Sequence, residues 1–318
     1  MEAATPSPAP AEPSREPGLF SASLPPMPRL PITSEATLER CAALDAREDD
    51  LFICSFPKSG TTWTQAIVHE LLRREHSIGV AKGEVDAEEP VEHISDFAPF
   101  FEVDRTWADG EPQHRQYGVR AFNTHLRWDM MPKHPGCRYI YLYRNGEDVC
   151  ASFFHHLSNQ EEEDGGIPDD FEAFLAAFLA GEAPFGKWAH HLQSWMPQRD
   201  ASDSQILFVR YEDLVADLEG QLLRFIAFLN LPQLRTELGA HRAELLDKLC
   251  FGGMQAQASF YQPRSVRWKN NFRFLRKGVK GDAKNLLSAA QFKRFHDQVE
   301  EDFGGALPPW MEELLSCT

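Results

Sequence analysis

Three short apolar runs along the chain each precede a segment in which apolar residues recur at helical spacing. The runs cover 51–56, 137–144 and 205–210. The segments with helical spacing cover 61–74, 147–157 and 218–229. Apolar runs of this length without alternation are typical of strands that are buried on both faces. Strands that alternate with helices predict an α/β fold, with one domain built on a central parallel sheet flanked by helices.

Four more helices are predicted from helical periodicity and from end signals. The first three cover 34–46, 171–179 and 188–195. Gly181 supplies an end signal for the second of these. Ser288 and Gln291 form a capping-box pattern that opens the fourth helix, and Gly304 lies where that helix would end.

Two segments differ in composition from the rest of the chain. Residues 1–30 are rich in Pro, Ala, Ser and Glu, so they cannot bury enough apolar surface to offset their ordering entropy. We expect 1–30 to be a disordered tail and 31–318 to form the domain. The segment 84–111 holds ten carboxylates and one basic side chain. We expect it to be a solvated loop region with no chemistry of its own.

Charge and cysteine usage exclude several classes of protein. The formal net charge is −16, whereas a nucleic-acid-binding surface is basic, so nucleic acid is not an expected partner. The six cysteines are scattered without a C-x-x-C pair, which favours reduced thiols. No run approaches the about 18 apolar residues of a membrane span, and the N-terminus has no signal-peptide pattern. We therefore expect a cytoplasmic protein without membrane contact.

A candidate anion site follows the first predicted strand, in SFPKSGTTW at 55–63. Ligands of parallel α/β sheets collect beyond the carboxyl ends of strands, so the position suits a binding site. Pro57 and Gly60 predict a tight turn whose amides could converge on an anion at the positive end of the next helix. Lys58 precedes the glycine, unlike the lysine of G-x-x-x-x-G-K-[ST], so the loop is P-loop-like only. The alternative is an ordinary glycine turn before a helix.

Basic residues elsewhere could hold a second anionic group. The segment 264–284 has eight basic residues and one acid, and Gly278 in it allows the backbone to approach a phosphate closely. Arg144 ends the second apolar run, and Ser152 lies about two helical turns further on. The alternatives are a solvated basic loop and an Arg144 side chain paired with a carboxylate. Three separate groups of this kind favour a ligand with two phosphate ends.

These segments together resemble the cytosolic sulfotransferases. The loop at 55–63 is similar to that family's Y-P-K-S-G-T-T-W, and YRNGEDVCASFFHH is similar to R-N-x-x-D-x-x-x-S. FLRKGVKGDAKN resembles R-K-G-x-x-G-D-W-K-N, and RYEDL resembles the family's Y-E-D element. AGEAPFGKWAHHLQSW fits G-x-W-x-x-H-x-x-x-W. The order and intervals of the motifs match from about residue 49 to residue 303.

The resemblance implies a reaction and the residues that perform it. The co-substrate would be 3′-phosphoadenosine 5′-phosphosulfate (PAPS), its sulfuryl group would pass to a small acceptor, and no metal would be required. The family's general base corresponds to His125 in Asn123–Thr124–His125–Leu126. Lys58 would stabilise charge on the leaving oxygen, as fixed cations do in phosphoryl transfer. The positions implied to bind the co-substrate are Lys58, Ser59, Gly60, Thr61, Thr62, Trp63, Arg144, Ser152, Tyr211, Phe251, Arg276, Lys277 and Gly278.

The chain departs from the family pattern at several of these places. Asn123 replaces the lysine two residues before the histidine, so it can donate a hydrogen bond but carries no charge. Ala283 replaces the tryptophan of G-D-W-K-N, and His156 stands where the family often has an aromatic pocket wall. The family's dimer motif is altered at Ala289 and Lys293, which argues against a family-style homodimer.

The acceptor end is the least specified part of the prediction. The resemblance implies that Asn123, Phe100 and His156 contact the acceptor, with Phe100 nearest. Phe101, Phe153 and Phe154 are further candidates that could equally be core residues. We expect a small, largely apolar molecule with a hydroxyl or amine. The alternative function is a nucleotide-binding protein with little or no turnover. A P-loop kinase would require the Walker spacing, and an anchored carbohydrate sulfotransferase would require a membrane segment. The sequence shows neither feature.

Overall fold

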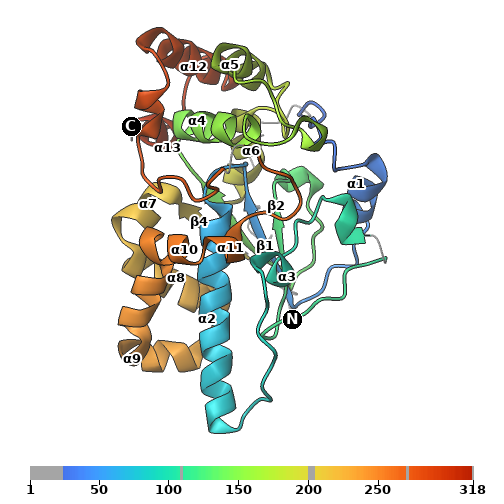
Figure 1. Ribbon diagram of the computed structural model, residues 1–318, viewed down its shortest axis with the longest axis vertical. Helices are drawn as coiled ribbons and strands as arrows, with labels where there is room; N and C mark the ends of the chain where they lie inside the picture. The colour runs from blue at the N-terminus through green and yellow to red at the C-terminus, as the bar shows by residue number, and fades with distance from the viewer. Residues whose placement is uncertain (1–23, 108–109, 200–204, 270–271, 317–318) are drawn as a thin grey trace, which may run out of the picture.

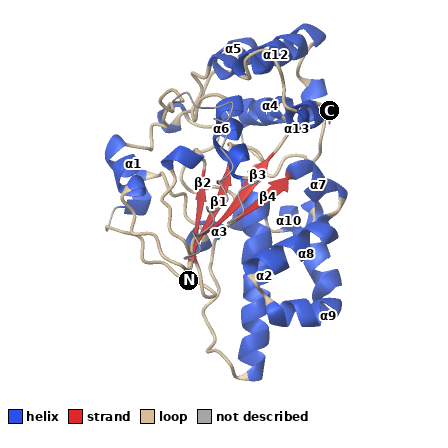
Figure 2. Ribbon diagram, turned by 180° about the vertical axis from the view of Figure 1, so that it is seen from behind, coloured by secondary structure: helices blue, strands red, loops and turns tan. Residues whose placement is uncertain are grey.

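Four parallel strands form the central sheet. The computed structural model describes residues 24–107, 110–199, 205–269 and 272–316. The sheet has the order β2-β1-β3-β4, with the strands Arg120–Thr124, Asp50–Ser55, Arg138–Tyr143 and Ile206–Arg210. Figure 2 shows the strands side by side with their carboxyl ends toward helices α4 and α6. The predicted α/β fold with a central parallel sheet flanked by helices is confirmed.

The sheet buries a different core on each face, because successive side chains of a strand point to opposite sides. In β1, Phe52 and Cys54 belong to a core rich in aromatic rings, while Leu51 and Ile53 belong to a core rich in Leu, Ile and Val. Helices α4, α5 and α6 contribute to the first core, and α2, α8 and α9 contribute to the second. In Figure 1, α4, α5 and α6 lie in the upper part of the view, and α2, α8 and α9 lie in the lower left.

The predicted helices are present; those at 188–195 and 218–229 have the predicted bounds, and the others begin or end at different residues. The α-helices of the described residues are α1 (Glu35–Ala42), α2 (Thr61–Lys82), α3 (Ile94–Phe97), α4 (Gly146–Leu157), α5 (Phe171–Ala180), α6 (Trp188–Trp195), α7 (Tyr211–Ala216), α8 (Leu218–Leu229), α9 (Pro232–Leu249), α10 (Phe251–Ala256), α11 (Ala258–Tyr261), α12 (Ala289–Asp302) and α13 (Pro309–Leu315). The capping box of α12 is confirmed, since Gln291 N–H donates to Ser288 Oγ and Ser288 N–H donates to Gln291 Oε1. Gly181 ends α5 in a left-handed conformation, as expected.

Two elements have no clear signal in the sequence. Strand β2 is only five residues long and includes Arg120 and Asn123, which interrupt its apolar pattern. Helix α9 buries Leu234, Leu245 and Leu249 and exposes polar residues between them, so it shows no continuous apolar stripe.

The prediction for the acidic segment 84–111 is wrong in part. It contains α3 and the buried side chains of Phe97 and Phe101, so it is not simply a solvated loop. Glu102 in this segment is fully buried beside His125. The apolar residues that fix the segment are too few and too irregularly spaced to predict this packing.

The predicted tail meets the domain before its expected boundary. Residues 1–23 lie outside the described part of the chain. Among 24–30, the Pro25 carbonyl accepts a hydrogen bond from Arg127 Nη1 at 2.6 Å. The Pro28 carbonyl accepts one from Phe185 N–H at 2.9 Å. Contacts with the domain therefore begin before residue 30.

Two sequence-based exclusions can be compared with the structure. Across the ranges that the structure describes, no helix is both long and apolar enough to cross a bilayer. The five cysteines within these ranges are all unpaired, and four of them are buried.

A buried ion pair joins β1 to β2 and should contribute strongly to stability. Arg120 and Asp50 are both fully buried, and Arg120 Nη2 lies 2.7 Å from Asp50 Oδ2. We expect Asp50→Asn to lower the free energy of unfolding by about 3–5 kcal/mol, because the Arg120 charge stays buried without its partner. Urea denaturation measures the change. Asp49→Asn is the control, since Asp49 pairs with the exposed Arg115 and should cost less than about 1 kcal/mol. Equal losses in both variants would contradict this view of the pair.

Candidate active site

A pocket of about 270 Å³ lies at the carboxyl ends of the strands. It collects residues from the loop after β1, the end of β2, the length of α4, the start of α7 and the irregular segment before α12. The predicted site residues that line it are Lys58, Gly60, Thr61, Thr62, Trp63, Phe100, Asn123, His125, Arg144, Ser152, His156, Tyr211, Phe251, Arg276, Lys277 and Gly278. Ser59 is buried just outside the lining. Positions far apart in sequence therefore meet at one site.

The loop after β1 has the backbone conformation of an anion cradle. Lys58 and Gly60 both have positive φ, at 67° and 108°, immediately before α2 begins at Thr61. A side chain at Gly60 is excluded, because a Cβ there would lie 2.8 Å from the Tyr211 ring. The Ser59 hydroxyl is buried and has no hydrogen-bond partner among the described residues. The loop thus offers the amino end of a long helix, the Lys58 side chain and the pocket-lining Thr61 and Thr62 to an anion.

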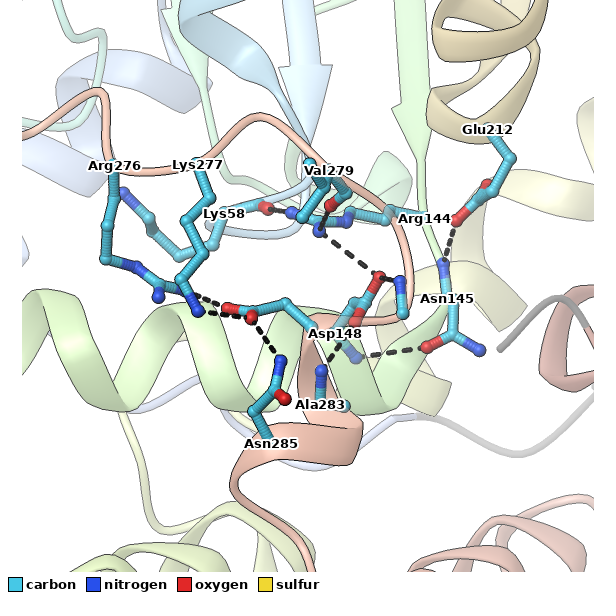
Figure 3. A network of polar contacts seen from close by, with 12 residues as sticks. Lys58, Arg144, Asn145, Asp148, Glu212, Arg276, Lys277, Val279, Ala283 and Asn285 are labelled. Carbon is cyan, nitrogen blue, oxygen red and sulfur yellow. Dashed lines mark hydrogen bonds and ion pairs between the residues drawn. The ribbon is translucent and has the colours of Figure 1, made fainter.

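Arg144 joins this loop to the basic segment. Its guanidinium stacks over Tyr211 at 4.2 Å, and its Nη1 donates to the Lys58 carbonyl at 3.2 Å. Nη2 donates to the Val279 carbonyl and contacts Asp148, at 3.1 and 3.3 Å (Figure 3). The carboxylate partner considered in the sequence is therefore present, and Arg144 also lines the pocket. Its Nε is buried and has no partner within the described chain.

The basic segment presents two cations and a glycine to the same pocket. Arg276 and Lys277 both bind the Asp282 carboxylate, with Lys277 Nζ at 2.6 Å. Figure 3 shows the Arg276 and Lys277 side chains next to each other beside α4. Gly278 has φ of 63°, and a Cβ at this position would lie 2.2 Å from the Phe251 ring. Glycine is therefore required where this segment crosses Phe251.

Three aromatic rings line the pocket beside the anion cradle. Trp63 Nε1 donates to the Leu249 carbonyl at 2.8 Å, which fixes the indole at the start of α2. Its ring lies 5.7 Å from Tyr211, edge to face. Phe251 follows at the start of α10 and also lines the pocket. Flat apolar surfaces next to basic groups suit a nucleobase attached to phosphates.

His125 has its tautomer fixed by the backbone. Its Nδ1 lies 2.8 Å from the Ser55 carbonyl, which can only accept, so Nδ1 carries the proton and Nε2 keeps its lone pair. The ring packs edge to face against Phe100 and Phe185, with centroids 5.2 and 5.1 Å away. Burial lowers the pKa of His125 to about 4; the bond to Ser55 opposes this shift and the Lys58 charge adds to it. The imidazole is neutral near pH 7 and can accept a proton.

Lys58, in the cradle loop, lines the same pocket as His125. Burial, together with the positive charges of Arg144 and Arg276, lowers the pKa of Lys58 to about 7. Its Nζ lies 3.1 Å from His156 Nδ1 and 4.5 Å from the centre of the Phe274 ring. An anion bound at the cradle would raise this pKa again, because an opposite charge favours the ammonium form.

The other predicted acceptor residues divide between pocket and core. Phe100 and Phe153 line the pocket, whereas Phe101 and Phe154 are buried in the aromatic core and are not pocket residues. Asn123 lines the pocket, but its Nδ2 donates to the Ala98 carbonyl at 2.6 Å. That bond holds the amide against the backbone.

Several pocket residues were missed by the sequence analysis. Leu30 and Ile32 come from the N-terminal segment, and Phe185, Gln160 and Phe274 come from three other places in the chain. Leu30, Ile32 and Gln160 lie outside every motif, whereas Phe185 and Phe274 lie in two of the motif segments but beside the matched positions. Their side chains reach the pocket only because distant loops pack together. Glu102 was also missed; its Oε1 accepts His125 N–H at 2.6 Å, and burial raises the pKa of Glu102 to about 7.

The pocket has an end suited to anions and an end suited to a neutral acceptor. The anion end has Lys58, Arg144 and the basic segment, and the other end has His125 surrounded by phenylalanines. A neutral base next to an anion cradle suits transfer of an activated anionic group to a hydroxyl or amine. Within the described residues, no group of three or more His, Cys, Asp or Glu side chains could hold a metal ion.

Known proteins match this chain over most of its length. The model of the Sulfotransferase domain matches residues 48–307. Sulfotransferase 2B1 from Homo sapiens is 33% identical, over 85% of this chain and 70% of the human protein. Amine sulfotransferase from Oryctolagus cuniculus is 29% identical, over 83% of this chain and 84% of its own.

A solved structure has the same fold. The mouse sulfotransferase SULT7A1, crystallised with PAP, superposes with a TM-score of 0.65 at 24% identity. The superposition covers 89% of this chain and 95% of the mouse chain. The family match extends over the strands, the cradle and the basic segment that build the pocket. On these grounds the chain belongs to the sulfotransferase family.

Proposed function

We propose that this protein transfers the sulfuryl group of PAPS to a hydroxyl or amine of a small, largely apolar acceptor, with His125 as general base. The observation that carries the proposal is a neutral His125, held through Nδ1 by the Ser55 carbonyl, in the same pocket as an anion cradle. The protein is proposed to act in the cytoplasm, without a metal and without the family's homodimer contact.

The residues of the anion end fit a nucleotide with two phosphate-bearing ends. Arg144 lines the pocket, and its Nε has no partner within the described residues, so its guanidinium can bind phosphate oxygens. Arg276, Lys277 and Gly278 would approach the 3′-phosphate together with Arg144 and Ser152. Trp63, Tyr211 and Phe251 offer their rings to the adenine. The mouse relative's complex with PAP supports this assignment.

The chain's own groups supply the steps of the transfer. PAPS, when bound, supplies an activated sulfuryl group whose bond to the phosphate oxygen breaks as the acceptor oxygen or nitrogen attacks. The acceptor's proton passes to His125 Nε2, the ring nitrogen left without a proton. Lys58 stabilises the negative charge that develops on the leaving phosphate oxygen. Phe100, Phe153 and Phe185 exclude water around the base.

The alternative is a protein that binds the nucleotide with little or no turnover. The observation in its favour is Asn123, which stands in place of a family lysine and has its Nδ2 committed to the Ala98 carbonyl. The neutral His125 and the intact Lys58 favour the active enzyme.

A transfer assay distinguishes the two functions. Sulfur-labelled PAPS is incubated with the protein and a panel of phenols, steroids, alcohols and amines, and labelled products are separated. The names of the human and rabbit relatives give no single acceptor class, so the panel covers each. Labelled product supports the enzyme. Tight 3′,5′-phosphoadenosine binding without product from any acceptor supports the binding protein, and failure to bind the nucleotide contradicts both.

The pH dependence of the enzyme should follow Lys58 on the alkaline side. kcat/KM for PAPS reports groups of the free enzyme. We expect it to fall as the pH rises above about 7, where Lys58 loses its proton, and to stay level down to about pH 5, because His125 protonates only near pH 4. Initial rates across this range measure the profile. Lys58→Arg should remove the alkaline fall, since arginine stays charged. An unchanged alkaline fall in that variant would contradict the assignment to Lys58.

A further inference from the structure

His156 gives the lysine of the anion cradle a hydrogen-bond acceptor. Its Nδ1 lies 3.1 Å from Lys58 Nζ. Within the described residues, no other hydrogen-bond acceptor lies within bonding distance of this ammonium group; the remaining close contact is the face of Phe274. His156 comes from the last turn of α4, nearly one hundred residues from Lys58. The contact therefore depends on the folded pocket and not on a local motif.

The imidazole of His156 must be the tautomer that accepts at Nδ1. An ammonium group can only donate, so the Nδ1 that faces Lys58 carries the lone pair and Nε2 carries the proton. Gln160 lies one turn further along, with its side-chain nitrogen 2.8 Å from Nε2 and its buried Oε1 without a partner among the described residues. A carboxamide turned by half a rotation places Oε1 against the Nε2 proton and satisfies both groups. Gln160 is thereby compatible with the tautomer that Lys58 requires.

Aromatic rings hold this pair of side chains in place. The His156 ring packs edge to face against Trp268 and Phe274, with centroids 5.0 and 6.0 Å away. The backbone of Gln160 forms an isolated antiparallel bridge with Trp268. The segment around Trp268 is thus attached to the chain just beyond α4, directly after the helical turn that carries His156. A ring fixed on this many sides can hold the lysine in one position.

The charges around Lys58 explain why a neutral acceptor is useful there. Arg144 and Arg276 face the ammonium group and repel it, and His125 and His156 are the other titratable groups that face it. Burial lowers the pKa of His156 well below its usual value, and the Lys58 charge adds to the effect. His156 is therefore neutral and adds no repulsion of its own. It accepts one N–H of the ammonium group and leaves two for an anion.

We propose that His156, oriented by Gln160, is a positioning residue for Lys58, holding the ammonium group where its two remaining N–H bonds face the reacting anionic group. The inference rests on the proposed sulfuryl transfer, and it adds a role for a side chain that the sequence analysis assigned only to the acceptor wall. Phenylalanine at this position would keep the wall and lose the acceptor.

The first test compares His156→Phe with His156→Asn. Asparagine can place an oxygen near the position of Nδ1, whereas phenylalanine cannot accept. We expect kcat to fall about tenfold in His156→Phe with KM for PAPS within about twofold, and to recover to within about threefold in His156→Asn. In a Lys58→Met background, His156→Phe should cause no further loss, because the role is exercised through the lysine. Equal losses with and without Lys58, or equal losses in Phe and Asn variants, would overturn the proposal.

A second measurement does not depend on catalysis. The unliganded protein is treated with acetic anhydride at about pH 6.5, and acetylation of Lys58 is followed by mass spectrometry. Loss of the acceptor disfavours the ammonium form, so Lys58 should react about threefold faster in His156→Phe and return toward the wild-type rate in His156→Asn. Unchanged acetylation in His156→Phe would overturn the inference. If the wild type transfers no sulfuryl group while this pattern holds, the proposed function fails and the Lys58–His156 contact stands.

Discussion

Replacing His125 with alanine is expected to lower kcat for sulfuryl transfer about 10²- to 10⁴-fold, the usual contribution of a positioned general base. The Ser55 carbonyl holds Nδ1, so Nε2 is the atom that accepts the proton, and alanine offers no substitute. Affinity for 3′,5′-phosphoadenosine should stay within about twofold, because the phosphate-binding side chains come from other segments. Initial-rate kinetics and calorimetric titration measure the two quantities.

His155→Ala is the matched control for this prediction. His155 is a half-buried histidine on α4, next to His156 in sequence but absent from the pocket lining. Its variant should keep transfer within about twofold of the wild type. If His125→Ala retained full kcat, or if both variants lost it equally, His125 could not be the general base.

Replacing Lys58 with methionine is expected to lower kcat about 10²- to 10³-fold, the usual cost of removing one preorganised charge-stabilising group. Methionine keeps most of the length and apolar contact of the side chain but has no charge. The effect should fall on kcat more than on nucleotide binding, since Arg144 and the basic segment remain to hold the phosphates.

Lys82→Met provides the control for the Lys58 variant. Lys82 ends α2, the helix that begins directly after the cradle, and it pairs with Glu237 at the surface. Transfer should be unaffected there, within about twofold. A Lys58→Met enzyme that lost only nucleotide affinity, with kcat unchanged at saturation, would assign Lys58 to binding and not to stabilisation of the leaving group.

The sheet was largely predictable from the sequence because three of its strands are continuous apolar runs followed by helices. The strand that was not predicted, β2, carries Arg120 at a fully buried position. The desolvation of a buried arginine is offset only when its partner, here Asp50, is also present. That pairing joins residues seventy positions apart. Local periodicity contains no information about such a contact. For the same reason, local periodicity does not predict how the acidic segment packs around Glu102.

The anion end of the site was predictable because its groups occur in short motifs at strand ends. Arg144, the cradle and the basic segment each carry a local signal, and parallel topology brings strand ends together. The acceptor end was less predictable, because Leu30, Ile32 and Gln160 have no motif and meet only in the folded chain. His156 was assigned to the pocket by resemblance, but its contact with Lys58 depends on tertiary structure.

Single-turnover transfer tests the central claim most directly. An excess of enzyme is mixed with sulfur-labelled PAPS and an acceptor found in the panel, and the label is followed with time. The account predicts that the label moves from the nucleotide to the acceptor in one exponential phase, and that in His125→Ala it stays on the nucleotide over the same interval. Label that remains on the nucleotide with the wild-type protein, or that moves equally fast without His125, would contradict it.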